Sequence, residues 1–301
     1  MKTFSPFQIF SFSLLLIYLA SCSSPEKKQT EETPPPAAKS MKMSEEQLVD
    51  SLQFYRENAI ITDLLSRENP DLERELASKI QLRVLEKELA KGKTKIGWKM
   101  GGTATSDPAQ FDPVFGYILN TNMIAPNSSV PMETFPGGGA MVEAEVGFII
   151  KNDLKEGLSS MDDAKSCIEY VVGAIEFAKS IATTSNGTQV NPAHVLATGM
   201  GQAGTIVGTV KIPASDFDFE NETAKCFING KLAAKGVASN IYGNPLNALY
   251  ELANLLPKYG QYLKAGDLVI TGSLYANPTI DDAAEVKVEF SNLGTISFKT
   301  E

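Results

Sequence analysis

Residues 141–150 read Met141-Val-Glu-Ala-Glu-Val-Gly-Phe-Ile-Ile150, an apolar run that holds two glutamates. Side chains alternate along a β-strand, so Glu143 and Glu145 would share one face and the apolar side chains would occupy the other. Two carboxylates on an apolar strand are costly unless a cation neutralises them, and divalent cations that prefer oxygen ligands do this well. The run therefore predicts a core strand with a metal site, and salt-bridged glutamates are the alternative.

The segment before this strand, residues 44–93, predicts a pair of helices. Ser44-Glu-Glu-Gln47 has the pattern of a capping box and would open a helix that continues to about Leu65. Asn69-Pro70 would begin a second helix, which Gly92 would end.

Residues 94–301 predict a larger domain rich in strands. A helix is expected from Asn244-Pro245, but strands and helices do not alternate regularly along the chain. This pattern favours an α+β fold with a mixed sheet or a barrel-like roll. The other strands are expected at Thr94–Met100, Tyr170–Ala178 with Glu176 inside it, Thr205–Ile212, Asp267–Ser273, Glu285–Phe290 and Thr295–Lys299.

The N-terminus indicates export. An apolar run from Ile9 to Ala20 follows Lys2, too short to span a bilayer but suited to a signal peptide. Leu19-Ala-Ser-Cys22 resembles the lipobox of bacterial lipoproteins, with an ordinary secretory signal as the alternative. The expectation is a signal peptide over 1–22, lipidation at Cys22, a polar disordered tether over 23–43, and a lipid-anchored protein of the bacterial envelope.

Composition excludes some classes of protein. The chain is 43% hydrophobic, as a globular protein is, and its net charge of -9 with no basic stripe argues against nucleic acid as a partner. Cys167 and Cys226 are expected to be buried free thiols, although an oxidising envelope would permit a disulfide.

Several motifs together resemble the 2-keto-4-pentenoate hydratase family, within the fumarylacetoacetate hydrolase superfamily. The resemblance covers about residues 44–301 and implies a mixed β roll, a bound Mg²⁺ or Mn²⁺ and a small 2-oxo acid substrate. The motifs, in chain order, are Gly97-Trp-Lys-Met-Gly-Gly-Thr103, Pro113-Val-Phe-Gly-Tyr117, Val142-Glu-Ala-Glu-Val146, Ala174-Ile-Glu-Phe177, Gly243-Asn-Pro-Leu-Asn-Ala-Leu249 and Leu263-Lys-Ala-Gly-Asp-Leu-Val-Ile-Thr-Gly-Ser273.

The resemblance assigns site residues. Glu143, Glu145 and Glu176 would hold the metal, in agreement with the alternation of the first strand. Lys99 would bind the substrate carboxylate or assist proton transfer, unless it is an ordinary surface lysine. Ser273 would lie near the substrate, unless it only ends a strand.

The chain also departs from the family pattern. Val114 stands where the family has an acid implicated in proton transfer. Lys179-Ser-Ile181 replaces an acid and an arginine, and Ala197-Thr-Gly-Met-Gly201 replaces a polar loop. His194, the one histidine, is expected to be structural or exposed.

Two classes of function remain open. The first is a hydratase-like lyase that acts on a 2-oxo or 2-hydroxydienoic acid, with a related decarboxylase or acylpyruvate hydrolase as variants. The second is a lipid-anchored protein that binds a metal and oxo acids without turnover. Expected partners are the small acid and, through the lipid, a membrane, with a homo-oligomer as a further expectation.

Overall fold

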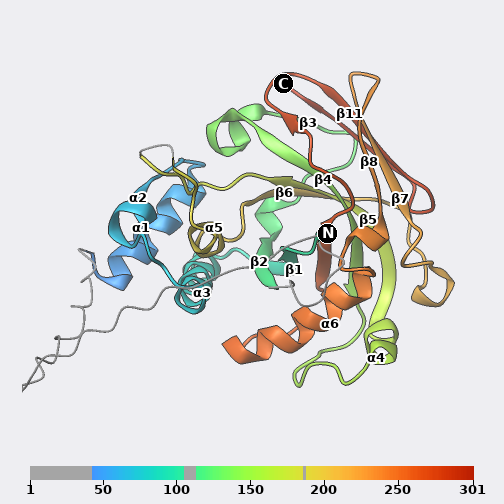
Figure 1. Ribbon diagram of the computed structural model, residues 1–301, viewed down its shortest axis with the longest axis horizontal. Helices are drawn as coiled ribbons and strands as arrows, with labels where there is room; N and C mark the ends of the chain where they lie inside the picture. Colours follow the sequence, from blue (N-terminus) through green and yellow to red (C-terminus); the bar gives the residue numbers. More distant parts are fainter. Residues whose placement is uncertain (1–42, 105–112, 186–187) are drawn as a thin grey trace, which may run out of the picture. The chain divides into compact units, whose positions relative to one another are not determined.

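The computed structural model describes residues 43–104, 113–185 and 188–301 (Figure 1). The predicted signal peptide, Cys22 and the tether up to residue 42 lie outside these ranges. Within them, no helix has the length and apolar character needed to cross a bilayer.

Three helices open the described chain: α1 (Glu45–Glu57), α2 (Leu64–Glu68) and α3 (Arg74–Ala90). The predicted capping box at Ser44 is confirmed, since its side chain accepts from the backbone N–H of Gln47 and the Gln47 side chain accepts in return. The prediction of one helix to Leu65 is wrong, because the chain leaves the helix after Glu57 and Ala59 takes a left-handed φ of 51°.

The predicted helix start at Asn69-Pro70 is also wrong. Asn69 ends α2, and α3 begins only at Arg74. The reason lies far along the chain: the Asn191 side chain donates to the carbonyls of Pro70 and Leu72, and His194 Nε2 lies 2.8 Å from the carbonyl oxygen of Asn69. These contacts take up carbonyls that a helix would otherwise use.

The strands form two sheets in the described part of the chain. The first has the order β2-β1-β9-β4-β5-β6, with β10 paired to β4; β1 and β9 run parallel and the other pairs run antiparallel. Its strands are β1 (Lys95–Gly101), β2 (Val114–Leu119), β4 (Ala140–Ile150), β5 (Ile168–Ala178), β6 (Gln202–Val207), β9 (Leu268–Ser273) and β10 (Thr279–Ile280).

The second sheet has the order β3-β12-β11-β7-β8. It contains the predicted C-terminal hairpin, in which β11 and β12 pair antiparallel across residues 291–294. Its strands are β3 (Ser129–Val130), β7 (Thr223–Ile228), β8 (Lys231–Val237), β11 (Glu285–Phe290) and β12 (Thr295–Thr300). The mixed sheets and separate helices confirm the predicted α+β class.

Further helices connect the strands. Asn244 caps α6 as predicted, through a 2.9 Å bond from the Leu246 N–H to its side chain. The α-helices are α4 (Met161–Ser166), α5 (Pro192–Ala197) and α6 (Pro245–Leu255). The 3₁₀ segments are η2 (Asn120–Asn122), η3 (Met132–Thr134), η4 (Pro136–Gly138), η5 (Ala214–Asp216), η6 (Ala238–Asn240) and η7 (Leu256–Tyr259).

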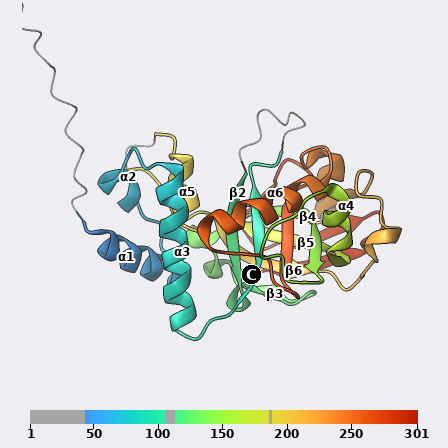
Figure 2. The ribbon, with the colours of Figure 1, turned by 90° about the horizontal axis from the view of Figure 1, so that it is seen from below.

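The main core lies between the sheets. Val142, Ala144, Val146 and Phe148 of β4 are fully buried, as the alternation predicts. Phe177 of β5 meets Phe298 of β12 edge to face, with 4.9 Å between ring centroids. Helices α1, α2, α3 and α5 group to one side of the sheets in both views (Figures 1 and 2) and share a smaller apolar cluster. Cys167 and Cys226 are buried free thiols, as expected.

Candidate metal centre and substrate cavity

Three carboxylates meet on one face of the first sheet. Glu143 of β4 lies directly opposite Glu176 of β5, and Glu145 follows two residues along β4 on the same face. One carboxylate oxygen from each lies within 4.8 Å of the others. Glu145 and Glu176 are fully buried and Glu143 is half-buried.

Each carboxylate accepts a hydrogen bond from a nitrogen donor in the described chain. The backbone N–H of Gly272 donates to Glu145 Oε2 at 2.6 Å, and the Asn277 side chain donates to Glu143 Oε1 at 2.7 Å. Lys99 Nζ donates to Glu176 Oε1. Among the atoms described, Glu145 Oε1 and Glu176 Oε2 are buried without a hydrogen-bond partner.

These contacts neutralise only part of the negative charge of the cluster, because three carboxylates face a single ammonium group. Buried oxygen atoms without partners are costly, and hard divalent cations take such ligands readily. The cluster therefore fits a divalent cation by both its charge and its unpartnered oxygens.

The carboxylates strongly shift one another's proton affinity. Burial, with a smaller contribution from Glu176, raises the pKa of Glu143 to about 7. Burial, together with Glu176 and Glu143, raises the pKa of Glu145 well above its ordinary value. Burial alone would lower the pKa of Lys99, but the carboxylates of Glu176, Glu143 and Glu145 outweigh it and raise that pKa. The three carboxylates therefore favour the protonated form of Lys99.

Lys99 lies on β1 with 4% of its surface exposed, so it is not an ordinary surface lysine. Its neighbours Trp98 and Met100 are buried on the opposite side, as the alternation predicts. Besides Glu176, its ammonium group reaches the carbonyl oxygen of Met200 at 3.2 Å. This places the charge beside the carboxylates, and its role toward a substrate stays a prediction.

A cavity of about 520 Å³ opens beside the cluster; we call it the carboxylate cavity. The polar residues that line it are Lys99, Thr103, Glu143, Lys179, Ser180, Ser273, Tyr275 and Asn277. Ser273 lines the cavity, and its hydroxyl donates to the carbonyl of Tyr275 at 3.0 Å; its role toward a substrate stays a prediction. The apolar and backbone wall includes Met100, Gly101, Gly102, Ala104, Met141, Ala178, Val195, Met200, Gly201, Gly272 and Ala276.

Sequence reasoning missed three groups that shape this site. Gly272 supplies the N–H that holds Glu145, and at its φ of 109° a Cβ atom would lie 2.0 Å from Thr103 Oγ1. Asn277 orients Glu143, and Tyr275 lines the cavity while its buried phenol, whose pKa burial raises, lies against Cys226. The turn motif that ends at Ser273 pointed to the region but not to these contacts.

The departures from the family pattern surround the same cavity. Val114 is half-buried beside Gly101, with its Cγ2 atom 3.2 Å from where a Gly101 Cβ would lie. Lys179 and Ser180 line the cavity. The loop Gly199-Met-Gly201 has three successive left-handed residues, with φ of 79°, 57° and 68°, and Met200 in such a conformation is strained.

His194 was expected to be structural or exposed, and the structure shows that it is structural. It is only 2% exposed, which rules out the exposed alternative, and its Nε2 atom contacts the carbonyl of Asn69. It is not among the described residues that line the carboxylate cavity.

Comparison with known proteins agrees with this fold and site. Residues 89–300 match the family described as the fumarylacetoacetate (FAA) hydrolase C-terminal domain. The chain therefore belongs to the fumarylacetoacetate hydrolase superfamily, and its similarity to hydratases confirms the predicted hydratase family.

Two proteins of known name to which the chain is similar are hydratases. The chain is 25% identical over 239 residues to the 2-oxo-hept-4-ene-1,7-dioate hydratase of Escherichia coli, covering 77% of this chain and 89% of the relative. It is also 25% identical over 261 residues to the 2-hydroxyhexa-2,4-dienoate hydratase of Comamonas testosteroni, covering 84% and 95%.

A solved structure shows the same fold. The 4-oxalocrotonate decarboxylase from Pseudomonas putida G7, complexed with magnesium and adipate, superimposes with a TM-score of 0.78 at 21% identity. The match covers 87% of this chain and 100% of that one. This likeness confirms the predicted mixed-sheet architecture of the superfamily.

Proposed function

We propose that the protein is a metal-dependent lyase of the hydratase type, acting on a small 2-oxo or 2-hydroxydienoic acid. The observation that carries the proposal is the buried cluster of Glu143, Glu145 and Glu176, with two unpartnered oxygens beside the Lys99 ammonium group. Such a costly arrangement is expected where chemistry requires it. The hydratase and decarboxylase names of its relatives support the same class.

The three glutamates would hold Mg²⁺ or Mn²⁺, because an all-oxygen set of carboxylates favours these ions over softer metals. When bound, the ion would polarise the oxygens of a 2-oxo acid and stabilise negative charge on them. The solved decarboxylase that carries magnesium supports this choice of ion.

The protein's own groups would bind and orient the acid. Lys99 keeps its proton, so it can pair with a substrate carboxylate through a charge-assisted hydrogen bond. The methionines of the cavity would exclude water from the carbon chain of the substrate.

One observation supports the alternatives to a hydratase. Hydration of a diene requires a proton to be delivered to carbon, and the side chain beside Gly101 is Val114 rather than an acid. A decarboxylase or an acylpyruvate hydrolase places other demands on proton transfer, and a binding protein places none. These remain the alternatives to the hydratase.

The test is a screen of purified protein with Mg²⁺ or Mn²⁺ against 2-hydroxypentadienoate, oxaloacetate and an acylpyruvate. We expect turnover of at least one compound, lost in Glu145→Gln and retained in Glu289→Gln, which removes a carboxylate from the other sheet. Metal binding by calorimetry without turnover of any compound would favour the binding protein. No metal binding would remove both functions.

We also propose that Cys22 is lipidated and anchors the protein to a membrane of the bacterial envelope. The sequence Leu19-Ala-Ser-Cys22 and the polar segment after it support this. Cys22→Ser should move the protein out of the membrane fraction or leave the signal peptide uncleaved. A mature N-terminus without lipid, read by mass spectrometry, would exclude the anchor.

A further inference from the structure

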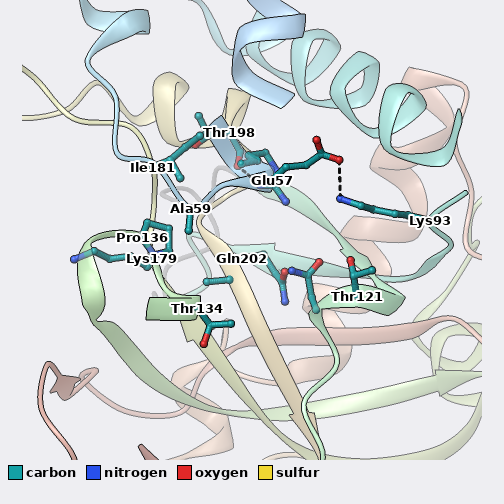
Figure 3. A pocket seen from close by; sticks show the side chains of 13 residues that line it. Glu57, Ala59, Lys93, Thr121, Thr134, Pro136, Lys179, Ile181, Thr198 and Gln202 are labelled. Carbon is teal, nitrogen blue, oxygen red and sulfur yellow. Dashed lines mark hydrogen bonds and ion pairs between the residues drawn. The ribbon is translucent and has the colours of Figure 1, made fainter. Parts of the chain in front are cut away.

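A second cavity, of about 300 Å³, lies between the N-terminal helices and the first sheet; we call it the Arg56 cavity (Figure 3). Its wall comes from the end of α1, η2, the segment around Pro136, the residues just after β5 and the start of β6. Among the described residues that line the two cavities, Lys179 alone is common to both. The Arg56 cavity is therefore a separate compartment of the size that a small ligand needs.

Among the described charged side chains that line the Arg56 cavity, the Arg56 guanidinium group is the one available to bind an anion. Lys93 is neutralised by Glu57, at 3.3 Å, and by Glu88, and the first of these ion pairs is visible in Figure 3. Lys179 extends away from the other labelled residues in that view. Within the described chain, Arg56 has no carboxylate partner and donates only to the carbonyl of Thr198.

The Arg56 guanidinium is also held in place. It lies over the ring of Tyr117, 5.0 Å from the centroid, and packs against Gly199. Its Nε atom is buried without a hydrogen-bond partner. A fixed guanidinium with unused N–H groups is a ready partner for a carboxylate or a phosphate, because its planar fork matches both.

A second unpartnered group lies in the same wall. Gln202 is 4% exposed, and its amide lies between Thr121 and Lys179 in Figure 3. One end of this amide bonds Thr205 Oγ1 at 2.8 Å and the other end has no partner in the described chain. A ligand hydroxyl would satisfy the free end in either orientation of the amide, since a hydroxyl both donates and accepts.

We propose that the Arg56 cavity is a second ligand site, which takes a small anion with a carboxylate or phosphate group for Arg56 and a hydroxyl group for Gln202. The site needs no metal and does not depend on the reaction at the carboxylate cavity.

The experiment is calorimetric titration of the full chain in EDTA with malate, succinate and inorganic phosphate. Malate and phosphate both offer a hydroxyl, whereas succinate does not. We expect malate or phosphate to bind the wild type and, with equal affinity, Glu145→Gln. Binding of malate would identify a carboxylate site, and binding of phosphate a phosphate site.

Arg56→Gln should weaken this binding by about tenfold or more, the loss of a charge-assisted hydrogen bond. Arg67→Gln, which removes the same charge at an exposed site outside the cavity, should change nothing. If Arg56→Gln does not fold, Gln202→Leu provides the second test and should lower malate affinity toward that of succinate.

Three results would overturn the proposal. The first is no binding of any of the three anions to the wild type at millimolar concentrations. The second is equal affinity in the wild type and in folded Arg56→Gln or Gln202→Leu. The third is loss of binding in Glu145→Gln, which would assign the anion to the carboxylate cavity.

Discussion

Glu143 and Glu176 are direct partners across the antiparallel pair of β4 and β5, so two acidic side chains occupy a position where like charges repel. Glu145, two residues along β4, adds a third acid that is fully buried. Lys99 offsets only part of this repulsion, through its contact with Glu176. The protein without metal is therefore less stable than its apolar core permits, and the free energy of a bound cation should appear directly as folding stability.

Metal removal tests this relation. Mg²⁺ at 100 times its dissociation constant should stabilise the folded wild type by about 2.7 kcal/mol, through mass action on the folded state. In Glu145→Gln the gain should fall close to zero, because a buried ligand is lost, whereas Glu289→Gln on β11 should match the wild type. Thermal unfolding with and without Mg²⁺ or Mn²⁺ measures both. Equal shifts in the wild type and Glu145→Gln would place the ion elsewhere.

The metal-free protein should lose stability as the pH rises. Burial and Glu176 raise the pKa of Glu143 from 4.5 to about 7, so the folded state holds a proton that the unfolded state releases. The stabilising contribution is complete below the unfolded pKa and is lost as the pH rises through the folded pKa.

In EDTA, the free energy of unfolding should therefore fall by roughly 2–3 kcal/mol between about pH 5 and about pH 8. Denaturant titrations across this range supply the measurement. Saturating Mg²⁺ should flatten the profile, and Glu143→Gln should reduce its slope. A flat profile in the metal-free wild type would contradict the raised pKa.

Lys99→Met should cost both stability and ligand affinity. The structure buries Lys99 against Glu176, so loss of its charge leaves a buried carboxylate without this partner. Breaking a buried pair costs roughly 3 kcal/mol. Oxalate affinity of the Mg²⁺-loaded protein should also fall by about tenfold or more.

Lys299→Met is the matched control, because Lys299 and Glu285 form an exposed pair whose loss should leave the free energy of unfolding nearly unchanged. Denaturant unfolding in EDTA and oxalate calorimetry together test Lys99. Wild-type stability and wild-type oxalate affinity in Lys99→Met would leave the carboxylates as the only supported recognition element.

Gly272→Ala should damage the site through geometry. The residue has a φ of 109°, and a Cβ atom would lie 2.0 Å from Thr103 Oγ1, so the N–H that holds Glu145 would have to move. The expected cost is about 2 kcal/mol or more in stability, with weaker metal binding. Gly230→Ala is the control, since its φ of 75° is also left-handed but its Cβ would meet nothing within 4 Å. Equal metal affinities in the two variants would show that the Gly272 backbone is not needed at the site.

The sequence predicted the acidic face well because that information is local. Alternation placed Glu143 and Glu145 together, and the resemblance added Glu176 and Lys99; the structure brings the three carboxylates within 4.8 Å of one another and Lys99 into contact with Glu176. The α+β class and the C-terminal hairpin were also accessible, because turn residues and apolar periodicity mark them.

What the sequence could not supply depends on distant contacts. The segment after Asn69 fails to form a helix because Asn191 and His194, more than 100 residues away, bind its carbonyls. Gly272 meets Glu145 only through the pairing of β9 with β4, and Asn277 reaches Glu143 from the loop beyond that strand. Neither contact leaves a local pattern in the sequence.

Val114→Asp is the variant that separates an enzyme from a binding protein. Val114 begins β2 beside Gly101, which lines the carboxylate cavity. The family pattern that the sequence resembles has an acid at this position. General acid–base groups contribute about 10²–10⁴-fold to a rate, so a restored acid should raise hydration of 2-hydroxypentadienoate by at least about tenfold over the wild type. Val114→Asn has the same shape without the acid and should not raise the rate. The half-buried site makes a small loss of stability expected in both variants, and that loss is measured by thermal unfolding. Val114→Asp could fold, bind Mg²⁺ and oxalate as the wild type does, and still add no water to any dienoate. In that case the missing acid is not what limits turnover, and the binding function becomes the better account of the buried carboxylate cluster.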